Sequence, residues 1–130
     1  MLIKGKSLYL IDFGLSRKVI DDGTESKQFV GNFMFCSVNR HQYKTVSFLD
    51  DLESVLYLIM YLEKRTLPWQ FIRVGNPKVQ SYQILRRKMR VNFKTIKNNY
   101  SKFLKKYYKK IKSKSFERES FWDELIDIFK

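Results

Sequence analysis

The strongest candidate for chemistry in this chain is the triplet Asp12-Phe13-Gly14, which follows the apolar run Leu8–Ile11. Such a run is typical of a short buried strand. A carboxylate placed after it offers the oxygen ligands that hard cations prefer. The competing interpretation is a strand that simply ends in a turn, because Asp and Gly are common turn residues. These three residues by themselves favour the turn.

The other reactive side chains indicate structural roles. Cys36 is the single cysteine, which excludes an internal disulfide and a cysteine-based zinc site. We expect it to be a small buried side chain rather than a nucleophile. Asp50 and Asp51 are adjacent in sequence and so do not share a helix face, which argues against an acid–base dyad. We expect both of them, and Glu53, to serve the start of a helix.

The hydrophobic pattern predicts a mainly α chain with a short β-hairpin at its N-terminus. The hairpin covers residues 2–14 around the turn Lys4–Ser7. Residues 15–35 have no clean period and predict a loop. The predicted helical segments are one turn in 36–41, a helix from Asp50 or Asp51 to about Lys64, and helices at 77–89, 101–112 and 117–129.

The segment 52–62 carries apolar residues on almost every side of its predicted helix. A helix that is apolar all round is buried, so we expect this one at the centre of the fold. Its apolar run is too short to span a bilayer, and the N-terminus does not have the pattern of a signal peptide. With one cysteine, the chain fits a reducing, intracellular setting, cytoplasmic or nuclear.

The net charge is +13, and it is unevenly distributed. From Lys64 to Phe116 there are 17 Lys and Arg residues and no Asp or Glu. Such a stretch attracts anions: phosphoproteins, acidic peptides, nucleic acid or anionic lipid. The hydrophobic content of 44% is enough for a packed core and argues against disorder.

The basic stretch has two interpretations. Aromatic residues among the cations would stack on nucleic-acid bases, and the candidates are Tyr82, Phe93, Tyr100, Tyr107 and Tyr108. Alternatively, the cations form a solvated helix face with sites for phosphorylated proteins. We favour the second, because the aromatic residues fall at helical spacing and would fill the core. Patches such as Lys105-Lys106 and Lys109-Lys110 would then bind polyanions weakly, at low salt.

Several motifs occur in an order that resembles one enzyme family. Asp12-Phe13-Gly14 is followed by Ser37-Val38-Asn39, by Asp-Asp-Leu-Glu-Ser at 50–54, and by Leu-Pro-Trp-Gln at 67–70. This order is similar to the large lobe of the casein kinase 1 family of Ser/Thr protein kinases, which has Ser-Ile-Asn in place of the usual Ala-Pro-Glu. The resemblance covers nearly the whole chain, from about Leu2 to Phe129.

The resemblance implies roles for a few residues. Asp12 would contact the magnesium ion that bridges ATP phosphates, Phe13 would pack inward to orient it, and Gly14 would let the backbone turn. Residues 15–35 would match the activation segment. Asp51 would anchor the backbone of the catalytic loop. Protein substrates of the family are acidic or already phosphorylated.

Other parts of a kinase are missing from these 130 residues. There is no glycine-rich loop Gly-x-Gly-x-x-Gly and no His-Arg-Asp, and His41 lies after Asp12, where it cannot belong to a catalytic loop. Within the matched region, Asn32 stands where the family has Thr, and Leu56 where it has Gly. We therefore expect a partial kinase domain over 1–130, with the small lobe absent, that is an inactive fragment or pseudokinase.

Two alternatives to the kinase interpretation stay open. One is a non-catalytic interaction module that docks kinase substrates or partners, and the other is a basic polyanion-binding domain. If the small lobe is missing, apolar surface near Phe13 and Leu15 is uncovered, and we expect the chain to self-associate through residues 8–16.

Overall fold

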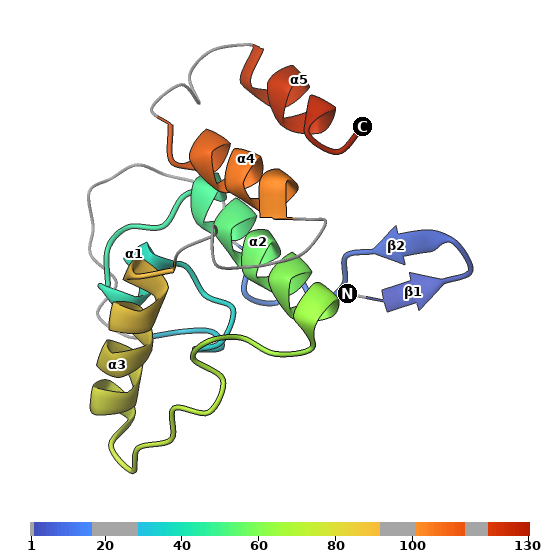
Figure 1. Ribbon diagram of the computed structural model, residues 1–130. Helices are drawn as coiled ribbons and strands as arrows, with labels where there is room; N and C mark the ends of the chain where they lie inside the picture. The colour runs from blue at the N-terminus through green and yellow to red at the C-terminus, as the bar shows by residue number, and fades with distance from the viewer. Residues whose placement is uncertain (1, 17–28, 92–100, 114–119) are drawn as a thin grey trace.

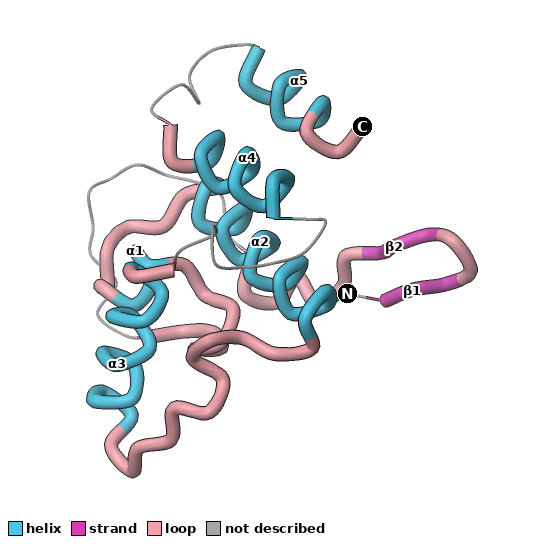
Figure 2. The backbone as a smooth tube through the Cα atoms, in the orientation of Figure 1, coloured by secondary structure: helices cyan, strands magenta, loops and turns pink. Residues whose placement is uncertain are grey.

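The computed structural model describes residues 2–16, 29–91, 101–113 and 120–130, and this part of the chain is mainly helical (Figure 1). One antiparallel hairpin precedes the helices, which gather into a single packed body (Figure 2). The elements are β1 (Leu2–Lys4), β2 (Ser7–Tyr9), α1 (Val38–His41), α2 (Phe48–Lys64), α3 (Pro77–Met89), α4 (Ser101–Ile111) and α5 (Ser120–Asp127).

The predicted hairpin is confirmed, but its predicted burial is wrong. Strands β1 and β2 pair with Ile3 opposite Leu8, and Gly5 has the positive φ of 63° that the tight turn between them needs. The second strand ends at Tyr9, and every described side chain from residue 4 to residue 16 is exposed. Figure 1 shows the hairpin projecting away from the helices, which agrees with the exposure of Leu8 and Tyr9.

Helix α2 begins three residues before Asp51, at Phe48, because Ser47 caps it. The Ser47 hydroxyl accepts a hydrogen bond from the Leu49 amide at 3.2 Å, and the Asp50 carboxylate accepts one from the Ser47 amide at 2.7 Å. This reciprocal pair is a capping box. Of the two predicted capping residues, Asp50 therefore takes part in the cap from inside the first turn, and Asp51 is exposed.

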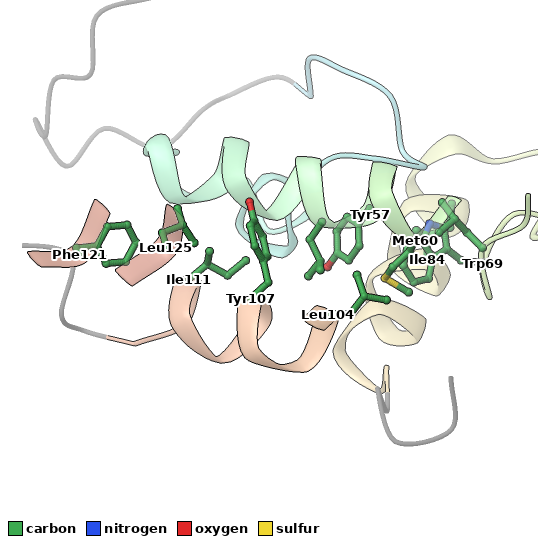
Figure 3. Close-up of a cluster of buried hydrophobic side chains, with 11 residues drawn as sticks. Tyr57, Met60, Trp69, Ile84, Leu104, Tyr107, Ile111, Phe121 and Leu125 are labelled. Carbon is green, nitrogen blue, oxygen red and sulfur yellow. The ribbon is translucent and has the colours of Figure 1, made fainter. Parts of the chain in front are cut away.

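The core lies along one side of α2, where α4 packs against it (Figure 3). Leu56, Tyr57 and Met60 are buried on this side, whereas Val55 and Leu62 are exposed. The prediction of a helix buried all round is therefore correct for one face only, since the described elements cover α2 on one side. The buried core consists of Leu56, Tyr57, Met60, Leu67, Trp69, Ile84, Leu104, Tyr107, Ile111, Phe121 and Leu125.

The remaining helices agree with their predicted positions. Helix α3 has the predicted bounds, with Asn76 as its N-cap and Pro77 in its first turn. Helix α4 ends one residue early, and α5 lies within the predicted 117–129, of which 117–119 fall outside the described residues. Most of the predicted loop 15–35 also falls outside them. No described helix is long and apolar enough to cross a membrane.

Candidate functional site

Asp12 lies directly before a turn, which the Ser16 amide closes by donating to the backbone oxygen of Phe13 at 2.9 Å. Its φ is 66°, in the left-handed region that few residues other than Gly adopt, although Asp tolerates it better than most. A Cβ added to Gly14 would lie 3.7 Å from Oδ1 of Asp12, so the carboxylate stands beside this glycine. The positive φ lies at Asp12 and not at Gly14. The resemblance assigns the backbone turn to Gly14, but the left-handed conformation lies two residues earlier, at Asp12.

Phe13 does not pack inward. Its side chain is 65% exposed, and its neighbours Leu10 and Leu15 are exposed as well. The expected inward packing requires a second surface to receive the ring, and no described part of the chain provides one. The segment that carries Asp12 is thus an uncovered apolar surface around a carboxylate.

The fit of a metal ion to Asp12 is partial. Among the described residues, no group of three His, Cys, Asp or Glu side chains is placed to hold a metal ion. A single carboxylate suits magnesium when phosphates and water supply the other oxygen ligands. Asp12 therefore fits the implied role of one ligand to magnesium–ATP, and it does not form a metal site by itself.

Glu53 is the residue that the sequence interpretation missed. It is 1% exposed. Its Oε1 accepts hydrogen bonds from the Tyr57 hydroxyl at 2.5 Å and the Val38 amide at 3.3 Å, and its Oε2 pairs with Nζ of Lys112 at 2.7 Å. A buried acid is stable only with such partners. The available signal was an acid one helical turn before a tyrosine, within the mainly apolar stretch 52–62.

Glu53 connects three parts of the fold that are remote in sequence. Its partners are the first residue of α1, the same face of α2, and the residue that follows α4. Burial and the neighbouring carboxylate raise the pKa of Tyr57 far above its usual value, so the phenol stays protonated and donates to Glu53. Glu53 is thus a structural centre rather than a residue of the helix start alone.

A second long-range contact fixes the segment that precedes α1. The indole Nε1 of Trp69 donates a hydrogen bond to the backbone oxygen of Met34 at 2.8 Å, and the Trp69 side chain is fully buried. Its ring also meets Tyr57 edge-on, with ring centroids 5.0 Å apart. Residues 34–38 are therefore held from α2 and from the loop after it.

Lys88 of α3 also holds the segment that precedes α1. It is 3% exposed, and its Nζ donates to the backbone oxygens of Phe33 at 2.8 Å and Cys36 at 2.6 Å. The third partner is Nε2 of His41 at 3.0 Å. The ammonium also lies 4.8 Å from the ring centroid of Tyr57, a favourable cation–π position. All three donors of the buried cation have partners, although burial lowers its pKa to about 8.

The contact with Lys88 determines the protonation of His41. An ammonium can only donate, so Nε2 must accept, and the ring proton lies on Nδ1, where it donates to the Ser81 hydroxyl at 2.8 Å. Burial, together with the charge of Lys88, lowers the pKa of His41 to about 3. The histidine is therefore a neutral structural bridge between α1 and α3.

Cys36 completes this cluster as an inert group. Its Sγ lies 3.3 Å from Nε2 of His41, and burial raises the pKa of its thiol. Reactive cysteines have lowered pKa values, so these surroundings agree with a structural role for Cys36. The expected burial is found only in part, because Cys36 is half-buried.

Asp51, which the resemblance links to the catalytic loop, faces solvent at the start of α2. Partial burial and the adjacent Asp50 raise the pKa of its carboxyl. Asp50 itself is buried, and its Oδ1 has no hydrogen-bond partner within the described part of the chain. The two carboxylates therefore do different things, and neither forms a dyad with the other.

Comparison with models of known protein families finds no match for this chain. The resemblance to casein kinase 1 accordingly depends on the sequence motifs alone.

Proposed function

We propose that this chain is the large-lobe part of a casein-kinase-1-like Ser/Thr protein kinase and that residues 1–130 do not transfer phosphate by themselves. The parent activity is transfer of the γ-phosphoryl group of ATP to Ser or Thr of acidic or phosphorylated proteins. The observation that carries the proposal is the convergence of motifs that lie far apart in the sequence.

Two hydrogen bonds connect the parts of the chain that carry these motifs. Val38 of Ser-Val-Asn donates to Glu53 of Asp-Asp-Leu-Glu-Ser, 15 residues later. Trp69 of Leu-Pro-Trp-Gln donates to Met34, 35 residues earlier, at the end of the segment that resembles an activation segment. These contacts bring the three motifs together around the end of that segment, and this arrangement supports the proposal.

Of the groups that this reaction needs, the chain offers a carboxylate that could bind the magnesium ion. When bound, magnesium–ATP would supply the phosphoryl group, and Asp12 would offer an oxygen ligand to the ion. Catalysis of this transfer depends on positioning and on electrostatic stabilisation of the phosphoryl group. The chain has no glycine-rich loop and no His-Arg-Asp to provide them. Hence we expect no turnover from residues 1–130.

The test is a phosphoryl-transfer assay with radiolabelled ATP, magnesium and casein, using the chain, Asp12→Asn and, as a matched surface control, Asp123→Asn on the exposed side of α5. All three should give background incorporation. Robust transfer that is lost in Asp12→Asn and kept in Asp123→Asn would overturn the inactivity of the chain.

Kinase ancestry needs its own test. Sequencing of the transcript upstream of Met1 should reveal an open frame with a glycine-rich loop and His-Arg-Asp, or the degenerate remains of them. An upstream frame that encodes an unrelated domain would count against the kinase interpretation.

A non-catalytic interaction module is the second candidate, and the uncovered segment 8–16 favours it. Leu8, Leu10, Phe13 and Leu15 are all more than half exposed. Contiguous exposed apolar surface is typical of interaction sites. Such a module would use this surface to hold a protein partner without any phosphate transfer.

A further inference from the structure

Helix α3 has one buried face and one exposed face. Ser81, Ile84, Leu85 and Lys88 point into the fold and are buried. The opposite face is exposed and contains Lys78, Tyr82, Gln83, Arg86, Arg87 and the C-cap residue Arg90. Lys78, Tyr82 and Arg86 are spaced four residues apart, so they follow one another on this face at intervals of about 6 Å.

The outward face of α3 carries charge of one sign. Residues 77–90 contain no acid, and the four exposed cations Lys78, Arg86, Arg87 and Arg90 take part in none of the ion pairs found among the described residues. Lys88, by contrast, is buried and occupied by backbone oxygens. This face is therefore a cluster of cations that is available to an anion.

An exposed aromatic ring lies within this cluster. Tyr82 is 58% exposed, and the guanidinium carbon of Arg86 lies 6.0 Å from the centroid of its ring. A tyrosine ring and a planar guanidinium are both surfaces on which unpaired bases stack.

Helix α4 provides a comparison within the same molecule. It carries exposed lysines at 102, 105, 106 and 109. Its central ring is not available, because Tyr107 is 1% exposed and its hydroxyl donates to the backbone oxygen of Leu52 at 3.0 Å. The interpretation that aromatic residues of the basic stretch fill the core is correct for Tyr107, correct in part for Tyr108, which packs half-buried against the core, and wrong for Tyr82. Phe93 and Tyr100 fall outside the described residues.

We propose that the outward face of α3 binds single-stranded nucleic acid, with Tyr82 and Arg86 stacking on a base and the flanking cations holding phosphates. Complementary charge brings the strand to this face, and the exposed ring distinguishes it from the lysines of α4. An acidic or phosphorylated polypeptide would use the cations but would have no base for the ring. Bases in a duplex are already stacked, so the face favours unpaired strands.

The experiment is fluorescence anisotropy with a labelled 12-nucleotide oligo-uridine, and the competitors are the corresponding duplex and poly-glutamate of equal charge. Tyr82→Ala should weaken oligo-uridine binding by about 5- to 100-fold, which corresponds to one stacked base. Tyr82→Phe should stay within about twofold, because it keeps the ring. Gln83→Ala, on the same exposed face, is the matched control and should bind like the unaltered chain.

The dependence on salt separates stacking from charge. Replacing Arg87 by Ala should reduce the slope of log Kd against log salt by about 0.7, the contribution of one phosphate contact to a single strand. Tyr82→Ala should weaken binding at every salt concentration and leave that slope unchanged, since the ring releases no counterion. Lys106→Ala, on α4, should change affinity less than Arg87→Ala does.

Two results would overturn the proposal. One is equal affinity for oligo-uridine in Tyr82→Ala and the unaltered chain, with poly-glutamate competing as well as nucleic acid; the face would then bind acidic polypeptides through charge alone. The other is tighter binding of duplex than of single strand. Tyr82 and Arg87 are exposed, so circular dichroism should show unchanged helix content in their variants, and any loss of affinity then reflects the surface itself.

Discussion

The ammonium of Lys88 donates a hydrogen bond to Nε2 of His41 across 3.0 Å, so a buried cation faces an imidazole that must stay neutral. This pair joins α3 to α1 and, through the backbone oxygens that Lys88 also binds, to residues 33–36. The segment that precedes α1 is therefore held by a polar network rather than by apolar packing alone.

Replacing Lys88 by Met should destabilise the fold severely. The change leaves the oxygens of Phe33 and Cys36 and Nε2 of His41 without their donor inside the protein. Unsatisfied buried acceptors are costly, so we expect a loss of about 3 kcal/mol or more in the free energy of unfolding. Urea unfolding followed by circular dichroism measures it. Lys109→Met, at an exposed position of α4, is the control and should change stability by less than about 0.5 kcal/mol.

The His41 pair predicts sensitivity to mild acid. Above its ordinary pKa of 6.5, His41 is neutral in both the folded and unfolded states and adds no pH dependence. As the pH falls below 6.5, the unfolded chain binds a proton that the folded chain refuses until about pH 3, so folding stability is lost over this interval. The slope is at most about 1.4 kcal/mol per pH unit.

The measurement for this pH effect is urea unfolding at pH 7.5, 6 and 5, compared with His41→Gln. Carboxylates titrate alike in both proteins, so the difference isolates the histidine. Lys88, Cys36 and Ser81 are the polar groups that contact the imidazole. The Cys36 thiol stays protonated over this range, and Lys88, with a pKa of about 8, is mostly charged at pH 7.5 and fully charged at pH 6 and 5. The unaltered chain should lose about 2 kcal/mol more than the variant between pH 7.5 and 5. Parallel losses would contradict the neutral histidine.

Glu53 should be far more sensitive to substitution than its partner Lys112. Glu53→Ala removes three contacts from a buried position and should cost about 3 kcal/mol or more. Lys112 is 39% exposed, so solvent weakens its ion pair, and in Lys112→Met the Glu53 carboxylate keeps its hydrogen bonds from Tyr57 and Val38. Lys112→Met should therefore cost less than Glu53→Ala. A double-mutant cycle by urea unfolding gives the coupling between them. Equal losses in the two single variants would show that the ion pair, and not the buried network, dominates.

The exposed segment 8–16 should promote self-association. Replacing Leu10 and Phe13 together by Ser removes two large apolar side chains from this surface and should shift the chain toward monomer. Sedimentation velocity over a hundredfold range of concentration measures the change. Phe71→Ser is the control, because Phe71 is as exposed as these residues but lies in the loop after α2. A chain that is monomeric at every concentration, before any substitution, would contradict the prediction.

Much of the local structure could be predicted from neighbouring residues. The bounds of α3 follow from Asn76 and Pro77 at its start, and the hairpin follows from apolar residues on either side of Gly5. Helix caps and turns depend on a few consecutive residues, so their signals survive in the sequence. The start of α2 was misplaced because Ser47 forms a capping box with Asp50, which was itself taken for the cap.

The sequence by itself determined the helices, the hairpin, the cationic stretch and the order of motifs that resembles casein kinase 1. Tertiary structure alone decided which side chains are covered. Tyr82 and Tyr107 both lie on amphipathic basic helices, yet one is exposed and the other is buried. Glu53, expected only to serve a helix start, and Lys88, part of a stretch expected to form a solvated face, are both buried. The physical reason is that burial depends on partners 15 to 59 residues away, such as Val38 and Lys112 for Glu53, and periodicity within one helix contains no information about them.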